Sequence, residues 1–74
     1  MAVDIGIFGQ LLPNQPRRQT VELQQSVSVR DLARMIGLEL DEVGLVMIDG
    51  VQSGLDHSVQ PDSRLCFFPY VSGG

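Results

Sequence analysis

The sequence predicts an α+β fold in which one helix packs across one face of a small mixed β-sheet. Apolar residues alternate with the two-residue period of strands near both ends of the chain, and one segment between them has helical spacing. A chain of 74 residues has room for a single hydrophobic core. A short helix between two groups of strands must therefore bury its apolar stripe against the sheet.

Two strands joined by a turn are expected at the start of the chain. Residues 3–9 alternate between apolar and other side chains, as a strand with one buried face does. The inward side chains of this strand are Val3, Ile5 and Ile7. The sequence Pro-Asn-Gln-Pro at 13–16 is typical of a turn, and residues 20–24 alternate again. Together these segments predict a β-hairpin.

The helix is predicted at residues 29–36. Ser28 and Asp31 resemble a capping box, in which the first side chain accepts a hydrogen bond from the fourth backbone N–H. Gly37 is placed to end the helix in the left-handed conformation. The apolar stripe consists of Val29, Leu32, Ala33 and Ile36.

The second half of the chain predicts the remaining strands. Residues 45–49 form an apolar strand that leads into Asp49-Gly50, a strong hairpin-turn sequence. Residues 51–59 are expected to contain a minor strand and a loop, and 61–63 a turn. The segment 65–68 is apolar on both faces, which is expected of a strand at the centre of a sheet or of one that carries a binding surface.

The compact arrangement for this element order is the β-grasp fold. It has a mixed sheet of four to five strands with one helix packed across it, and the first and last strands lie side by side at the sheet centre. We expect residues 1–74 to form a single β-grasp domain with a flexible C-terminal tail at about 70–74.

Composition excludes several classes of function. The net charge of −4, with no lysine, disfavours non-specific binding to nucleic acid and suggests a partner with a basic or mixed surface. The one cysteine cannot form an internal disulfide or a metal site alone. No apolar stretch is long enough to span a bilayer. From these three observations together we expect a cytoplasmic protein that binds no membrane, no nucleic acid and no metal.

The last residues, Val71-Ser72-Gly73-Gly74, are the most informative part of the chain. Glycine has no Cβ, so a tail that ends in Gly73 and Gly74 can enter a narrow tunnel and present its carboxylate there. A carboxylate is an anion near neutral pH and a poor electrophile. We find no P-loop and no Ser/His/Asp set in the sequence that could activate it.

The chain resembles the ubiquitin-like sulfur carriers of the MoaD/ThiS family, and within them the small subunit of molybdopterin synthase. The resemblance covers the whole chain in element order and is carried by Ile48-Asp49-Gly50 and by residues 61–74. Its specific part is Phe67-Phe68-Pro69 followed by Val71-Ser72-Gly73-Gly74. Two departures are Asp62-Ser63, where the family usually has Gly-Asp, and Tyr70, where a second proline is common.

The resemblance implies a carrier and not an enzyme. An activating enzyme of the ubiquitin-activating type would adenylate Gly74, and a sulfur donor would convert the transient acyl-AMP into a thiocarboxylate. The carrier would then insert its tail into the large subunit of a synthase and donate sulfur in cofactor biosynthesis, with molybdopterin as the expected product. The two departures leave open a related carrier for thiamin, another cofactor or cysteine synthesis. No permanently bound cofactor is expected.

A docking face is expected beside the tail. By the alternation of the strands, Phe8 and Phe68 point away from the core, and they meet if the first and last strands are neighbours. Exposed aromatic side chains of this kind are common anchors of interfaces. The resemblance places partner contacts here, and Pro69, Tyr70 and Val71 continue the face toward the tail.

Three further residues are assigned more modest roles. Cys66 is expected to pack among apolar neighbours in its strand. His57 lies in a polar loop without a second histidine nearby, so a metal-binding role is not expected. Arg64 is placed close to the tail, where it is expected to pair with an acidic residue of a partner.

Two other functions remain open on the sequence alone. A ubiquitin-like protein modifier would use the same activation of Gly74 and join it to a lysine of a target. A β-grasp interaction module would carry the Gly-Gly ending incidentally, and its binding would survive removal of both glycines.

Overall fold

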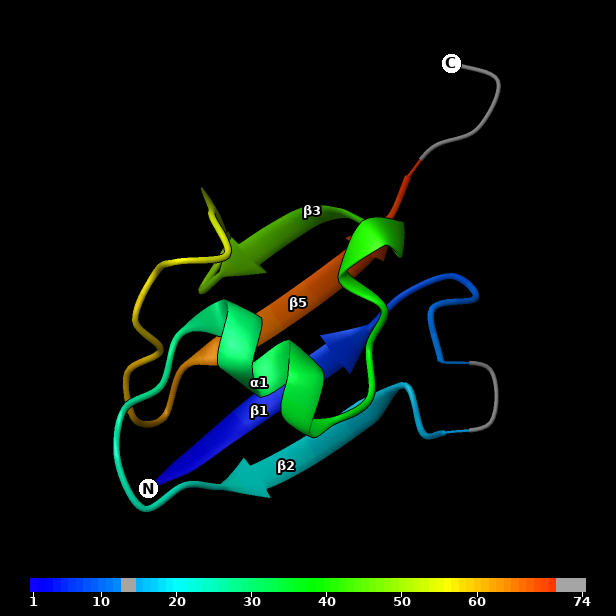
Figure 1. Ribbon diagram of the computed structural model, residues 1–74. Helices are drawn as coiled ribbons and strands as arrows, with labels where there is room; N and C mark the ends of the chain where they lie inside the picture. Colours follow the sequence, from blue (N-terminus) through cyan, green and yellow to red (C-terminus); the bar gives the residue numbers. More distant parts are fainter. Residues whose placement is uncertain (13–14, 71–74) are drawn as a thin grey trace.

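The computed structural model describes residues 1–12 and 15–70 (Figure 1). Its elements, in chain order, are β1 (Ala2–Ile7), β2 (Arg18–Glu22), α1 (Val29–Met35), a 3₁₀ turn (Leu40–Glu42), β3 (Val43–Ile48), β4 (Val51–Ser53) and β5 (Arg64–Pro69). Residues 13 and 14 of the turn expected at 13–16 and the tail from Val71 onward lie outside the described residues.

The strands form one mixed sheet in the order β2-β1-β5-β3-β4. β1 and β5 are parallel neighbours at its centre, and the other neighbouring pairs are antiparallel. α1 crosses one face of the sheet, as Figure 1 shows. The first and last of these strands therefore lie side by side, and the predicted β-grasp fold is confirmed.

The hydrophobic core lies between α1 and the sheet. Ile5 of β1 and both Leu65 and Phe67 of β5 are at most 2% exposed, and Val29 and Leu32 of α1 are fully buried against them. Full burial of one such side chain contributes roughly 1.5–3 kcal/mol to stability. The inward alternation predicted for the two central strands is therefore confirmed, and it fixes which side chains face outward.

β2 is shifted toward the start of the chain relative to the prediction of 20–24. It begins at Arg18. The prediction missed its first two residues because Gln19 is polar although it occupies an inward position opposite Ile5, and this conceals the alternation. The strand is assigned only as far as Glu22, yet Leu23 and Met1 still exchange hydrogen bonds of 2.7 and 2.9 Å. The pairing thus extends one residue pair beyond the assigned strand.

The ends of α1 follow the sequence signals. The Ser28 hydroxyl accepts a hydrogen bond from the Asp31 backbone N–H at 3.1 Å, which satisfies one of the unpaired donors of the first turn. Gly37 has φ of +88°, and its N–H donates to the Arg34 carbonyl at 3.1 Å. No helix in the described part of the chain has the length and apolar character needed to cross a bilayer.

β3 begins at Val43, two residues before the prediction, because an unpredicted 3₁₀ turn at Leu40–Glu42 brings the chain back to the sheet earlier. β3 and β4 are joined at Asp49 and Gly50, whose φ values of 51° and 82° are those of a tight hairpin turn. This turn is as the sequence predicted.

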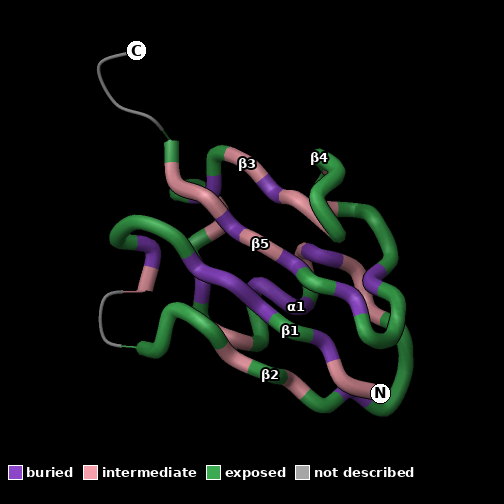
Figure 2. The backbone as a smooth tube through the Cα atoms, turned by 180° about the vertical axis from the view of Figure 1, so that it is seen from behind, coloured by how far each residue is buried: buried purple, intermediate pink, exposed green. Residues whose placement is uncertain are grey.

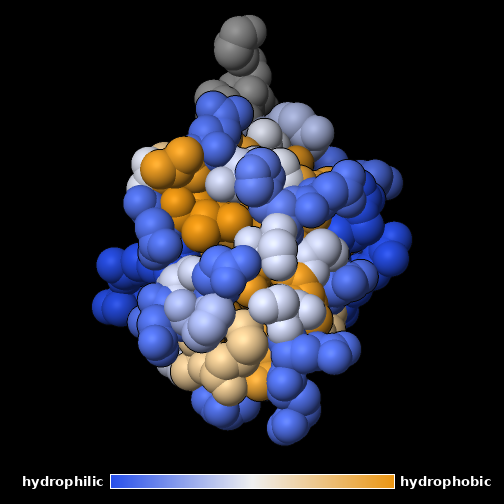
Figure 3. Space-filling model, turned by 90° about the vertical axis from the view of Figure 1, so that its left-hand side faces the viewer, coloured by the Kyte–Doolittle hydropathy of each residue, from blue (hydrophilic) through white to orange (hydrophobic). Residues whose placement is uncertain are grey.

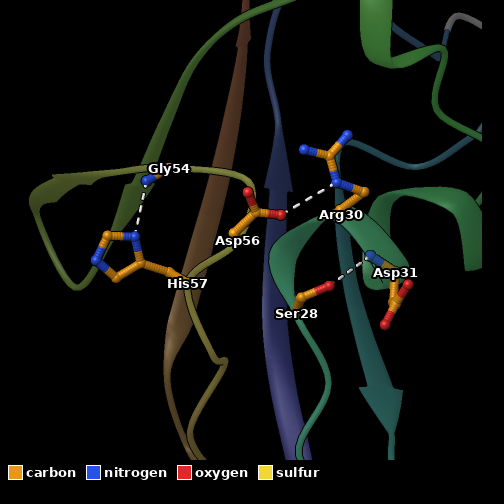
Figure 4. A network of polar contacts seen from close by, with 6 residues as sticks. All are labelled: Ser28, Arg30, Asp31, Gly54, Asp56 and His57. Carbon is orange, nitrogen blue, oxygen red and sulfur yellow. Dashed lines mark hydrogen bonds and ion pairs between the residues drawn. The ribbon is translucent and has the colours of Figure 1, made fainter.

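The loop between β4 and β5 is fastened to the start of α1 (Figure 4). The Arg30 side chain forms an ion pair with Asp56 at 3.2 Å, and the Val29 backbone N–H donates to the His57 carbonyl at 2.9 Å. Within the loop, His57 Nδ1 accepts a hydrogen bond from the Gly54 N–H at 3.0 Å. His57 therefore has a structural contact within its own loop.

Candidate docking face beside the end of β5

Figure 2 views the molecule from behind, so that the face of the sheet opposite α1 is toward the reader, and we call it the outer face. Along β5 the side chains alternate between the two faces of the sheet. Leu65 and Phe67 point inward and are fully buried, whereas Cys66 and Phe68 point outward and are half-buried. Phe8 follows directly after β1 and joins the outer face.

Phe8 and Phe68 form a stacked pair on the outer face. Their ring centroids are 4.5 Å apart and the ring planes differ by 9°. The Phe8 backbone N–H donates to the Phe67 carbonyl at 3.0 Å, which continues the parallel pairing of β1 with β5 and holds the two rings together. Phe8 remains 45% exposed. The sequence correctly predicted that these rings meet, and their role in partner binding stays a prediction.

Two glycines lie against the chain where it leaves β5, and no sequence pattern predicted this contact for either of them. Gly9 has φ of +67°, and a Cβ built on it would lie 2.6 Å from Cγ of Pro69. A Cβ on Gly44 would lie 2.8 Å from Cα and 2.9 Å from the backbone nitrogen of Tyr70. Real Cβ atoms do not approach other atoms this closely, so any other residue at either position would require residues 69 and 70 to move.

The contact at Gly44 arises from an irregularity in the sheet. Val43 pairs with Pro69 and Leu45 pairs with Phe68, so the register between β3 and β5 shifts across Gly44. A strand with an extra residue bends locally and twists more strongly. The sequence gives no direct signal for this contact, because the two segments are distant in the chain.

The predicted docking residues fall into two groups. Pro69 ends β5 and is half-buried, and Tyr70, the last described residue, is 66% exposed. The other predicted residues of the docking face and tail lie outside the described residues: Val71, Ser72, Gly73 and Gly74.

Arg64, which was expected close to the tail, lies at the opposite end of β5 from Tyr70, the last described residue. It is the first residue of β5, six residues before Tyr70, and a strand rises about 3.3 Å per residue, which separates them by roughly 20 Å. Its backbone N–H donates to Asp49 Oδ1 at 2.9 Å. Nearness in sequence was a poor guide because the intervening residues form a fully extended strand.

Cys66 packs against neighbours in the sheet, but on the outer face and not in the core. It is opposite Gly6 in the pairing of β1 with β5, and a Cβ on Gly6 would lie 3.3 Å from its Sγ. The thiol is half-buried. Cys66 therefore belongs to the same surface as the stacked Phe8–Phe68 pair.

Comparisons with known proteins bear on the fold. No family model matches the chain, and no curated protein matches it. Among solved structures, SAMP1 from Haloferax volcanii is similar, with a TM-score of 0.76 and 24% sequence identity over 100% of both chains. At this identity the likeness establishes the architecture alone. By fold, the chain is a ubiquitin-like β-grasp protein.

Proposed function

We propose that this protein is a sulfur carrier whose working group is a thiocarboxylate at Gly74. It receives sulfur after activation by an adenylating enzyme and donates it in cofactor biosynthesis, with molybdopterin synthesis as the pathway. The observation that carries the proposal is the sequence Phe67-Phe68-Pro69, which closes the central strand of a ubiquitin-like fold and is followed by Val71-Ser72-Gly73-Gly74.

The proposed chemistry proceeds in two balanced steps. A carboxylate oxygen of Gly74 attacks the α-phosphorus of ATP, pyrophosphate leaves, and an acyl-AMP anhydride forms. Sulfide then attacks the carbonyl carbon, the bond to the AMP oxygen breaks, and AMP leaves a thiocarboxylate behind. Adenylation is required because an unmodified carboxylate resists nucleophiles.

The positions of the two reactive side chains support activation by a separate enzyme. His57 is hydrogen-bonded within the loop beside the start of α1, and Cys66 lies in the middle of β5 on the outer face. Neither side chain lies at the end of β5 from which the chain continues toward Gly74. The protein accordingly acts as a carrier, and the activating enzyme, the sulfur donor and a synthase large subunit are its proposed partners.

The proposed docking surface comprises Phe8, Phe68, Pro69, Tyr70 and Val71. Its support is the stacked Phe8–Phe68 pair and the exposure of Tyr70, which together present aromatic surface beside the end of β5. Aromatic groups of this kind supply much of the binding energy in protein interfaces. A partner seated here is placed beside the chain segment that leads to the reactive terminus.

The test is intact-protein mass spectrometry of the chain incubated with an adenylating enzyme, ATP and a sulfide source. We expect a mass gain equal to the replacement of one oxygen by sulfur, located by fragmentation at Gly74. The same spectrum establishes whether Gly74 is the C-terminal residue of the purified protein.

The matched control is the chain without Gly73 and Gly74. It should gain no sulfur and yet unfold at the same urea concentration as the parent, because every buried core residue of the described chain lies at or before Phe67. Gly74 found bonded to lysines of other proteins would assign the protein to the modifiers instead. A shortened chain that retains full cellular function would point to an interaction module and refute the carrier.

A further inference from the structure

A groove of about 740 Å³ crosses the outer face of the sheet in front of β2, β1, β5 and β3. We propose that this outer groove is a docking site for a partner-protein segment that combines one large apolar side chain with flanking acidic residues. The residues that carry the argument are Gly6, Cys66, Phe8, Phe68, Arg18 and Arg64. The proposal concerns the folded body and holds whatever chemistry Gly74 performs.

The groove is hollow because two small residues lie side by side in the central strands. Gly6 of β1 is the register partner of Cys66 of β5, and both face outward. A Cβ on Gly6 would approach Cys66 Sγ and Phe8 Cε2 to 3.3 Å each, closer than most real Cβ contacts. The missing side chain therefore leaves a floor that lies below the neighbouring aromatic rings.

The walls of the outer groove are largely apolar. The stacked Phe8–Phe68 pair closes one end, and the half-buried Met47 of β3 lies opposite Cys66 in the sheet register. By contrast, the side of the molecule shown in Figure 3 is mostly hydrophilic, with apolar residues in separate small patches. A continuous apolar hollow next to an exposed aromatic residue is typical of an interaction site.

The rim of the outer groove is positively charged. Arg17 and Arg18 on the β2 side and Arg64 on β5 all line it, so three of the five arginines of the chain gather here. In the part of the chain that the structure describes, the ion pairs join the Met1 amino group to Glu22 and Arg30 to Asp56, and these three arginines take part in neither.

Two carboxylates lie close to Arg64: Asp49 also lines the groove, and Asp4 is the register partner of Arg64. Asp49 Oδ1 accepts a hydrogen bond from the backbone N–H of Arg64 at 2.9 Å, and Asp4 Oδ1 accepts one from the Thr20 hydroxyl at 3.0 Å. Because the ion pairs of the described residues do not use the guanidinium groups of the rim, these groups retain donors for an external anion. In a chain with a net charge of −4, this concentration of cations is local to one face.

The charges select the occupant. A guanidinium group binds a carboxylate through two parallel hydrogen bonds, which gives both affinity and direction. Arg18 is opposite Gly6 across the β1–β2 pairing, and Arg64 lies two residues before Cys66 along β5, so cations stand on two sides of the apolar floor. An apolar side chain seated over Gly6 with acidic residues on either side meets both features. The preference is opposite to the one that net charge alone suggests.

The experiment uses a phage-displayed library of random peptides selected on the immobilised full chain. Peptides that also bind a Gly6→Val variant are removed, since valine suits a β-strand and fills the groove floor. We expect the surviving peptides to be enriched in aspartate and glutamate around one aromatic or large aliphatic residue. They should also slow alkylation of Cys66, the one cysteine of the chain.

Charge reversals provide the second measurement. Arg18→Glu and Arg64→Glu should each weaken binding of the selected peptides about tenfold or more, as close charge pairs at interfaces do. Arg34→Glu is the matched control, because it makes the same change in net charge on the exposed side of α1, across the sheet. It should change the affinity less than about twofold, since salt screens distant charges.

Three results would overturn the proposal. The selected peptides could lack enrichment in acidic residues, they could fail to slow alkylation of Cys66, or Arg34→Glu could weaken peptide binding as much as Arg18→Glu and Arg64→Glu do. Thermal unfolding of every variant accompanies the binding data. If Gly6→Val does not fold, the selection is repeated without counter-selection, and the charge reversals together with Cys66 protection decide the outcome.

Discussion

Gly44 shows how a single missing side chain shapes the chain where it leaves β5. We predict that Gly44→Ala lowers the free energy of unfolding by about 1–3 kcal/mol, the usual cost of inserting an atom into a filled space. The added Cβ would lie 2.8 Å from Cα of Tyr70, and backbone atoms cannot rotate away as a flexible side chain can. Urea denaturation monitored by circular dichroism measures the loss.

Gly54→Ala is the matched control for this change. A Cβ at Gly54 meets only His57 Nδ1, at an ordinary contact distance of 3.7 Å. With no clash, the substitution should be neutral or stabilise by up to about 1 kcal/mol, because alanine restricts the unfolded chain. Equal losses from both substitutions would contradict the close contact between Gly44 and Tyr70.

Phe67 and Phe68 are adjacent in sequence but should differ sharply in their effect on stability. Phe67 is fully buried in the core, so Phe67→Ala should cost about 3–5 kcal/mol. Phe68 is half-buried against Phe8, and removal of its ring sacrifices a stacking contact of about 0.5–1.5 kcal/mol together with a smaller buried area. Equilibrium unfolding of the two variants compares them directly, and equal losses would place Phe68 in the core.

At the scale of elements, α1 depends on its cap more than on its visible ion pair. Ser28→Ala should lower the free energy of unfolding by about 1 kcal/mol, because the Asp31 N–H loses its acceptor at the start of the helix. Asp56→Asn breaks the ion pair with Arg30, yet the Asp56 side chain is 86% exposed, so the change should stay within about 0.5 kcal/mol. Thermal melting of both variants tests this order, which a larger loss from Asp56→Asn would reverse.

The elements themselves could be predicted because their causes are local. The helix follows from the spacing of its stripe, the Ser28 cap and Gly37, and the turn at Asp49-Gly50 follows from the intrinsic tolerance of these residues for positive φ. The start of β2 could not be predicted, since a polar Gln19 takes an inward place opposite Ile5. That placement is decided by pairing with β1 and leaves no trace in the polarity of β2.

At the scale of the whole molecule, only part of the candidate site could be predicted. The meeting of Phe8 with Phe68 followed from strand alternation once β1 and β5 were taken as neighbours. The clustering of Arg18 and Arg64 around one groove could not be foreseen, because residues from separate strands come together only after the register is fixed. The net charge gave the opposite indication, since it sums over all faces of the protein.

The central position of β5 also affects how the protein is made. β1 is the first of the five strands to be translated, and β5, its neighbour at the centre of the sheet, is the last of them. Contacts between such distant segments slow folding, and the core remains open until Leu65 and Phe67 exist. A nascent chain therefore cannot present the proposed docking face in folded form before the strand that leads to Gly74 has been synthesised. If the proposed function holds, the fold thus acts as a check on completeness, because a chain truncated before β5 would lack both the folded face and Gly74.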